Sequence, residues 1–538
     1  MRAAALLALL LVPHLAAAQP DAAARVDSVF AAWRAPGVPG CAVGVAQNGR
    51  TVLRRAYGLA ELEHQVPNTP ETVFEAGSVS KQFTAAAVVL LARQGRLSLE
   101  DDIRRWIPEV PDYGLTITIR HLLNHTSGLR DWGSVMEIAG WPRGSRIHTH
   151  AHVLDIVARQ RSLNFHPGAQ YLYSNTGYNL LAILVERVSG TRFAEFSRRE
   201  IFQPLGMTHT QWRDDFTRIV PGRAQAYTRR GGEFRLQMPF ENVHGNGGLL
   251  TTVDDLLRWN QAIASGALGG ILGEMETRGR LAGGRQIEYA LGLRVAPYRG
   301  VREVAHSGST AGYRAYLARY PDQSLSVAVL CNASGANPTL LAHRTADVFL
   351  GDAARDTPLP PAITVDAAEL ERHAGLYRST RTGEPMSLVM AEGRLTHGGG
   401  QPLVPIAPGV FRRGESETRI EMLNATPALA RVVYPDGDTV VFEAVPAWEP
   451  TPAQLAELTG EYQGHEAEAT FTVAVEENRL VLRRRPDTVL PLAPAYQDAF
   501  TTPEGWLVRF SRFREGRGRA LTISVERVRD LFFARIAG

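Results

Sequence analysis

The sequence contains a single lysine. Lysine and arginine together account for 58 of its 538 residues, yet Lys81 is the only lysine, so arginine occupies every other such position. Arginine stays protonated at any working pH, whereas a lysine removed from water can lose its proton and act as a base. This bias indicates that the chemistry at position 81 requires lysine.

Cysteine is almost as scarce. The only two, Cys41 and Cys331, each lie in a short apolar run typical of a β-strand. We expect both to be buried free thiols, and a disulfide between them is the alternative if the protein is exported.

A strong charge imbalance and a long apolar run are also missing. The net charge of +3 gives no strong field and does not indicate nucleic-acid binding. The three consecutive arginines at 483–485 are interpreted as a solvated strand edge. After the first 20 residues, no run approaches the roughly 20 apolar residues that cross a membrane.

The first 18 residues have the pattern of a secretory signal. Arg2 precedes an apolar run at 3–12, and small residues at 16–18 form a cleavage site. We expect cleavage after Ala18 and a soluble periplasmic or secreted protein.

Ser78 and Lys81 stand three residues apart, just before an apolar segment at 85–91 that predicts a buried helix ending near Gly95. Residues i and i+3 of a helix share one face, so the amine can reach the serine oxygen. Burial favours a neutral lysine, and a basic group beside a serine activates it as a nucleophile.

Other polar clusters fit structural roles when each is taken alone. Residues 117–129 predict a short helix with Gly128 as its C-cap, and His125 is interpreted as a brace at the helix end. Tyr173 and Asn175 follow a Pro-Gly turn and can point into one cleft, although this cluster by itself favours a buried tyrosine and a helix cap.

The histidines at 148, 150 and 152 alternate as metal ligands can. Thr149 is typical of an N-cap, so we expect these histidines on an exposed first helical turn and no metal site. The glycine-rich segment 244–255 lacks the spacing of a phosphate loop and predicts a tight loop before a helix.

The chain changes character after about residue 355, where a proline-rich linker at 358–361 begins a region of strands and turns. A pattern there repeats at an interval of 85 residues. The recurring residues are Leu370, Gly375 and Tyr377, which correspond to Leu455, Gly460 and Tyr462. The repeat indicates two all-β modules of about this length, separated by a second linker at 446–452. We expect each module to form a small closed barrel.

Three short motifs resemble those of penicillin-recognising serine hydrolases, in particular the class C β-lactamase-like group, in both their order and their spacing. They are Ser78-Val79-Ser80-Lys81, Tyr173-Ser174-Asn175 and His306-Ser307-Gly308. The resemblance covers about residues 25–345. It implies an α/β (α+β) domain with an antiparallel sheet, an all-helical lobe and a site between them. The two tail modules, taken as lipocalin-like barrels, resemble those of the three-domain D-aminopeptidases.

The resemblance also implies roles for individual residues. Ser78 would be the nucleophile, and Lys81 and Tyr173 would transfer protons. The implied substrate-binding residues are Asn175, His306 and Gly308, and the implied oxyanion hole consists of the backbone N–H groups of Ser78 and Ser309.

One position departs from the pattern. β-Lactamases of this group carry lysine where this chain has His306, and histidine is largely neutral near pH 7. The departure disfavours β-lactam hydrolysis. A His-x-Gly motif at this position is instead similar to that of D-aminopeptidases and some D,D-carboxypeptidases.

We expect a signal peptide at 1–18, a hydrolase domain at 19–355 and all-β modules at 356–447 and 448–538. The leading hypothesis is an exported serine hydrolase that forms an acyl-enzyme and cleaves a small amide, peptide or ester, with a D-amino-acid peptide favoured. A broad carboxylesterase, a D,D-carboxypeptidase and a β-lactamase are alternatives, as is a noncatalytic binding or sensing protein. We expect no cofactor, no metal, no nucleic acid and no membrane span. The expected partner is a small-molecule or peptide substrate, and a homo-oligomer is an open alternative.

Overall fold

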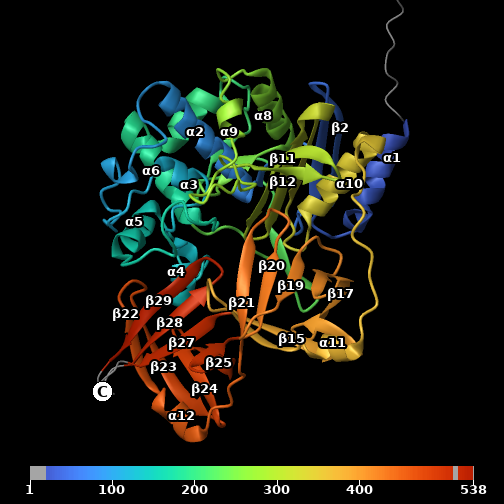
Figure 1. Ribbon diagram of the computed structural model, residues 1–538. Coiled ribbons are helices and arrows are strands. Elements are labelled where there is room, and N and C mark those ends of the chain that lie inside the picture. The colour runs from blue at the N-terminus through green and yellow to red at the C-terminus, as the bar shows by residue number, and fades with distance from the viewer. Residues whose placement is uncertain (1–19, 513–518, 537–538) are drawn as a thin grey trace, which may run out of the picture.

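The chain folds into a mixed α/β domain followed by two β-barrels (Figure 1). The computed structural model describes residues 20–512 and 519–536, so the export signal predicted at 1–18 lies outside the described residues. In Figure 1 the α/β domain occupies the upper part of the molecule and the barrels lie below it. The predicted fold class is confirmed.

An antiparallel six-stranded sheet forms the centre of the first domain, in the order β10-β11-β12-β13-β1-β2. The strands are β1 (Cys41–Gln47), β2 (Arg50–Tyr57), β10 (Arg294–Tyr298), β11 (Val301–Thr310), β12 (Tyr313–Tyr320) and β13 (Leu325–Cys331). The β1–β2 hairpin turns at Asn48 and Gly49, with φ of 52° and 73°. Positive φ at both central residues is what a two-residue hairpin loop needs.

Helices cover both faces of this sheet. On one face, α10 (Pro338–Leu350) packs on β12 and β13, and α1 (Pro20–Val29) packs on α10. On the other face, α8 (Val253–Ser265) packs on β1 and β13. Successive strand residues point to opposite faces, so Val329 packs with the α1 and α10 side chains and Leu330 with those of α8.

The helical lobe is built around α2 (Lys81–Arg93), whose side chains are nearly all buried as far as Leu91. This confirms the buried helix predicted after Ser78. The helices of the lobe are α3 (Ile119–Leu123), α4 (Trp132–Ile138), α5 (His150–Arg159), α6 (Asn175–Ser189) and α7 (Phe193–Ser197), and α2 packs directly against α6 and α7.

The predicted C-cap at Gly128 is wrong. Helix α3 already ends at Leu123, and its C-cap is Asn124. Gly128 has a φ of 76°, and a Cβ at this position would lie 2.1 Å from the carbonyl oxygen of Phe165. Glycine is required here because another backbone segment approaches closely.

The histidines near α5 are not on an exposed turn, which corrects that expectation. Thr149 is the N-cap of α5, and its N–H donates to His152 Nδ1 at 3.1 Å. His148 is buried, and His150 Nε2 lies 2.9 Å from the carbonyl oxygen of His244. These histidines are buried or half-buried because the segment preceding His244 packs over the start of α5.

The prediction of two free thiols is also wrong. Cys41 and Cys331 form a disulfide, although 290 residues separate them in sequence. They lie directly opposite each other in the β1–β13 ladder, with their Cα atoms 4.0 Å apart. The pairing follows from the strand register, which the sequence by itself does not specify.

Each tail module is a closed barrel of eight strands. The first comprises β14 (Gly375–Ser379), β15 (Pro385–Ala391), β16 (Arg394–His397), β17 (Gln401–Ala407), β18 (Val410–Arg413), β19 (Arg419–Leu423), β20 (Leu429–Val433) and β21 (Thr439–Val445). The second comprises β22 (Gly460–Gly464), β23 (Ala469–Glu476), β24 (Arg479–Arg484), β25 (Thr488–Pro494), β26 (Ala499–Thr501), β27 (Leu507–Arg512), β28 (Arg519–Val525) and β29 (Val528–Arg535).

The internal repeat is visible in matched hydrogen bonds. A short helix precedes each barrel, α11 (Ala367–Glu371) in one and α12 (Pro452–Glu457) in the other. The hydroxyl of Tyr377 donates to the carbonyl oxygen of His373 at 3.0 Å, and the hydroxyl of Tyr462 donates to that of Leu458 at 2.8 Å. The two barrels therefore begin with the same local structure, as the repeat predicts.

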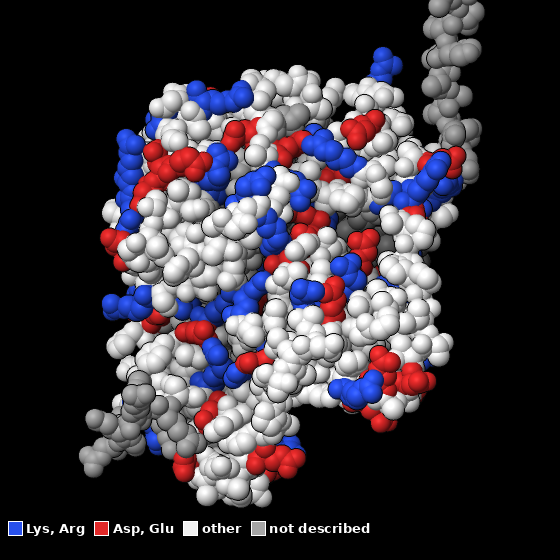
Figure 2. Space-filling view, viewed as in Figure 1, with Lys and Arg blue, Asp and Glu red and all other residues white. Residues whose placement is uncertain are grey.

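The second barrel docks on the helical lobe through two of the consecutive arginines. Arg484 donates to the carbonyl oxygen of Glu137, and Arg485 Nε donates to that of Ala139 at 2.9 Å, both at the end of α4. Arg483 is exposed, so the predicted solvated edge holds only for that residue. Figure 2 shows basic and acidic side chains interspersed over the visible face. Among the described residues, no helix has the length and apolarity needed to cross a membrane.

Candidate active site

Ser78 lies in a tight turn between a short strand and a buried helix. The strand β5 (Phe74–Glu75) leads into the 3-10 turn Gly77–Ser80, and α2 begins at Lys81. The serine is therefore held at the entrance of α2, one turn from the lysine. This is the arrangement that the Ser-x-x-Lys spacing predicts.

This turn packs against β11 almost backbone to backbone. A Cβ at Gly77 would lie 2.5 Å from the backbone nitrogen of Ser309, and a Cβ at Gly308 would lie 2.0 Å from the carbonyl oxygen of Ala76. Such distances leave room only for glycine. The turn that carries Ser78 thus approaches Gly308 closely. Gly308, expected to bind substrate, is not among the residues that line the cleft.

The amine of Lys81 is completely buried and is surrounded by neutral acceptors. The side chain is 0% exposed. Its Nζ lies 3.1 Å from Ser78 Oγ, 3.0 Å from Asn175 Oδ1 and 2.6 Å from the carbonyl oxygen of Asn246. Asn246 comes from the glycine-rich loop before α8, a contribution that the sequence analysis missed.

Several causes lower the pKa of Lys81 well below its ordinary value of 10.5. Burial is the largest, because it removes water from the ammonium form. The positive charges of Arg527 and Arg143 act in the same direction, and the carboxylate of Asp131 opposes them. The neutral amine is therefore far more accessible than for a lysine in water.

The single lysine makes this pKa directly measurable. Selective isotope labelling of lysine gives one Cε signal, and we expect it to titrate well below pH 10.5 in the folded protein. The neutral base is populated above this pKa, so activity should rise with pH along the acidic limb. Arg527→Gln removes a cation that lowers the pKa, so both the Cε midpoint and the acidic limb should move to higher pH.

The denatured protein is the control for this titration, because there the midpoint of the Cε signal should return to the ordinary lysine pKa of 10.5. A Cε midpoint at that value in the folded protein would contradict the expectation.

Tyr173 faces the same amine with its ring. Lys81 Nζ lies 4.8 Å from the ring centroid, and the Tyr173 hydroxyl is buried without a hydrogen-bond partner. Burial raises the pKa of Tyr173, and the nearby Ser78 hydroxyl lowers it by less. The phenol is therefore protonated at neutral pH, and its hydroxyl is available to a substrate.

The sequence analysis interpreted His125 as a brace at a helix end, and in the structure its ring packs against Tyr173. Its ring centroid lies 4.2 Å from that of Tyr173, and its Nδ1 accepts a hydrogen bond from the backbone N–H of Ser174 at 3.2 Å. Burial is the main cause that holds the pKa of His125 well below its ordinary value. A neutral imidazole thus packs behind Tyr173 without adding a charge.

His306 is a neutral residue of the cleft. Its Nδ1 lies 2.6 Å from the carbonyl oxygen of Ser307, which can only accept, so Nδ1 carries the proton. Its Nε2 then accepts from the Tyr289 hydroxyl at 2.9 Å. Burial, with a smaller effect from Lys81, lowers the pKa of His306 to about 3. The position therefore supplies no fixed positive charge at neutral pH.

The predicted residues surround a cleft of about 460 Å³. The residues that line it are Gly77, Ser78, Arg143, Tyr173, Asn175, Asn246, Gly247, His306, Ser307, Ser309, Thr310 and Arg527. The cleft thus joins the Ser78 turn, the Tyr173 loop and β11. It also includes two arginines that the sequence analysis did not identify.

The two arginines come from different domains. Arg143 follows α4 in the helical lobe, and Arg527 lies at the tip of the β28–β29 hairpin of the second barrel. In a chain whose basic residues are almost all arginine, no local pattern distinguishes these two. Their roles depend on contacts between distant parts of the chain.

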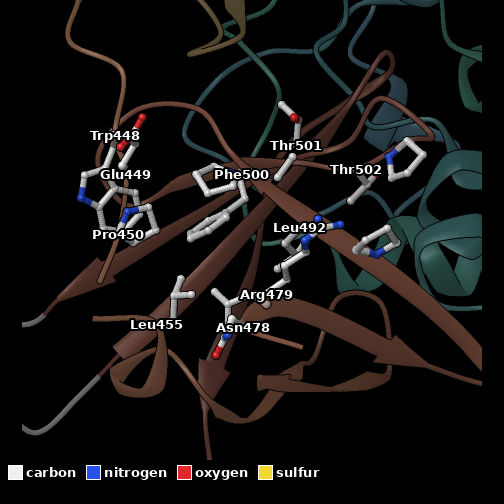
Figure 3. Close-up of a pocket in the computed structure, with 15 residues that line it drawn as sticks. Trp448, Glu449, Pro450, Leu455, Asn478, Arg479, Leu492, Phe500, Thr501 and Thr502 are labelled. Atoms are coloured by element: carbon white, nitrogen blue, oxygen red, sulfur yellow. The ribbon is translucent and has the colours of Figure 1, made fainter. Parts of the chain in front are cut away.

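A larger cavity, of about 780 Å³, lies in the second barrel (Figure 3). Trp448, Leu455, Leu492 and Phe500 contribute to its apolar lining, and Asn478 and Arg479 also line it. It shares no lining residue with the cleft that contains Ser78. The two cavities are therefore separate, and the site residues predicted from the sequence lie at the smaller one.

The fold and the serine–lysine–tyrosine cluster define a serine hydrolase of the penicillin-recognising type. The chain belongs to the Beta-lactamase family, whose model matches residues 26–351, more than half of the chain.

Two relatives match over nearly the full length. The D-aminopeptidase of Brucella anthropi is 27% identical over 536 residues, which cover 93% of this chain and 95% of that protein. The D-aminopeptidase of Gluconobacter oxydans is 26% identical and is covered to 99%, with 95% of this chain aligned. The octameric penicillin-binding protein homologue from Pyrococcus abyssi shares the fold, with a TM-score of 0.56, 20% identity and coverage of 96% of this chain and 99% of that one.

Proposed function

We propose that the protein is exported and hydrolyses a small amide, peptide or ester through an acyl-enzyme on Ser78, with a D-amino-acid peptide as the favoured substrate. The observation that carries this proposal is the buried Lys81 amine, 3.1 Å from Ser78 Oγ and surrounded by neutral acceptors. A lysine used to neutralise a carboxylate would instead have that carboxylate as its partner.

The first step is the attack of Ser78 on the substrate carbonyl. A neutral Lys81 keeps two N–H bonds for Asn175 and Asn246 and directs its lone pair at the Ser78 hydroxyl. Its nitrogen takes the hydroxyl proton as Oγ bonds to the carbonyl carbon, and the carbonyl oxygen becomes an oxyanion.

The backbone N–H groups of Ser78 and Ser309 would stabilise this oxyanion. Two observations support the pair. The ladder between β10 and β11 stops at Ala305, so the β11 edge at Ser309 is left open. The same edge lies against the turn that carries Ser78, since a Cβ at Gly77 would lie only 2.5 Å from Ser309 N.

The second step is the release of the leaving group. The Tyr173 hydroxyl donates its proton to the leaving amine or alkoxide as the bond to the carbonyl carbon breaks, and the Lys81 ammonium returns a proton to Tyr173. Water then attacks the acyl-enzyme with the same groups acting in reverse. Asn175, whose Oδ1 is engaged by Lys81, keeps its NH₂ group for the amide oxygen of a substrate.

Two observations support export. Residues 1–18 have the pattern of a secretory signal. The Cys41–Cys331 disulfide is typical of proteins in oxidising compartments.

The test compares p-nitroanilides of D-alanine and L-alanine, each with a free amine and with an N-acetyl cap. We expect turnover of a D substrate that exceeds that of its L counterpart, measured as kcat/KM. Comparing kcat/KM for the free-amine and the N-acetylated substrates tests whether the site acts as an aminopeptidase. Turnover of a p-nitrophenyl ester with no turnover of any anilide would favour the carboxylesterase and contradict the peptide proposal.

A further inference from the structure

The second barrel contributes a side chain to the cleft of the first domain. The β28–β29 hairpin reverses direction at Glu526 and Arg527. Arg527 lines the same cleft as Ser78, and its Cζ lies 4.9 Å from the ring centroid of Tyr173. A residue more than 400 positions after the serine thus belongs to the same site.

Buried and part-buried polar contacts fix the position of this hairpin. The carbonyl oxygen of Arg527 accepts from Asn164 Nδ2 at 3.1 Å, and the backbone N–H of Arg529 donates to Asn164 Oδ1 at 2.8 Å. The buried Arg130 donates to the carbonyl oxygen of Arg529 and forms an ion pair with Glu466 of the same barrel at 2.8 Å. The hairpin is therefore held in place by its main chain, independently of the Arg527 side chain.

The guanidinium of Arg527 retains capacity for a ligand. Within the described part of the chain its ion-pair partner is Glu526, 3.5 Å away and with a side chain 81% exposed. The ion-pair contact is made by Nε, which is buried and forms no hydrogen bond. Arg143 differs, because both it and the buried Arg213 pair with the carboxylate of Glu241.

The charge of the cleft suits an anion. No aspartate or glutamate is among the residues that line it. His306, which replaces the lysine of related β-lactamases, is neutral and hydrogen-bonded through both ring nitrogens. A planar guanidinium with free N–H groups matches the two oxygens of a carboxylate.

We propose that Arg527 binds a carboxylate of the substrate and so determines its specificity. This inference rests on the proposed function. The guanidinium lies over Tyr173, the residue that would protonate the leaving amine, so the carboxylate belongs to the leaving amino acid. The favoured substrate is then a peptide cleaved at its last bond, next to a free α-carboxylate. The second barrel completes the site by presenting this arginine.

The experiment uses two substrates that differ only in this group, N-acetyl-D-alanyl-D-alanine and N-acetyl-D-alanyl-D-alaninamide. Wild type should prefer the acid. In Arg527→Gln, the ratio of kcat/KM for the acid to that for the amide should fall about 10- to 100-fold, as for loss of a hydrogen bond to a charged group. Any change in the Lys81 pKa affects both substrates and cancels in the ratio.

Two further variants serve as controls. Arg529→Gln removes a cation two residues away whose side chain is bonded to Gln170, and it should leave the ratio unchanged. Arg527→Lys keeps the charge without the planar fork and should give an intermediate ratio.

A p-nitrophenyl ester separates the two proposals. Without ester or peptide turnover by wild type, the serine hydrolase proposal itself fails. If wild type hydrolyses the ester but treats acid and amide alike, or if Arg527→Gln leaves their ratio unchanged, the carboxylate role of Arg527 is overturned and the acyl-enzyme proposal stands.

Discussion

Ser78→Ala is expected to abolish turnover of amide and ester substrates, with a loss in kcat/KM of roughly 10,000-fold or more. Removing the nucleophile of a serine hydrolase leaves only the catalysis due to binding and the oxyanion hole. Alanine fits the turn without a new contact, since the serine Oγ points towards the Lys81 amine. Initial rates on the ester and on the anilides measure the effect.

Mass spectrometry adds a direct test of the same step. Wild type mixed with a slowly hydrolysed ester should gain the mass of one acyl group on the peptide that contains Ser78, and the alanine variant should gain none. Full turnover by the variant would place the nucleophile elsewhere. If wild type also lacks every hydrolytic activity, the noncatalytic binding protein becomes the better interpretation.

Lys81→Arg is expected to be as damaging as removal of the side chain, with a loss of about 100- to 10,000-fold in the acylation rate, the range for a lost general base. Arginine keeps the positive charge but cannot release its proton at working pH. It also places a larger group where the lysine is completely buried. Stopped-flow measurement of acyl-enzyme formation isolates this step.

The matched control is Arg93→Lys, an exchange of the same two residue types at the exposed end of the same helix. It should leave acylation unchanged. Near-normal acylation by Lys81→Arg would mean that the lysine acts through its charge alone, and would contradict its role as the base.

Much of the fold could be predicted because its signals are local. Asn48-Gly49 marks a hairpin through the φ values that it adopts, and the segment after Lys81 marks a buried helix through its uninterrupted apolar residues. The 85-residue repeat predicted two modules because each repeat carries a full set of strand and turn residues.

Predictions failed where a segment packs against a distant part of the chain. Gly128 appeared to be a helix cap, but its conformation is required by the backbone at Phe165. The pattern around Thr149 predicts exposed histidines, but His148 and His150 are hydrogen-bonded to Asn242 and His244. Arg484 and Arg485 appeared solvated, yet they donate to the end of α4.

The sequence by itself determined the serine–lysine pair, since a spacing of three residues at a helix start fixes which side chains meet. It also determined the three-part organisation, because apolar periodicity and repeats are properties of short segments. Only the tertiary structure decided that Cys41 meets Cys331, that His306 is neutral and that Arg527 enters the cleft. Each of these depends on strand register, burial or docking between segments far apart in the chain, and no pattern within a few neighbouring residues records such contacts.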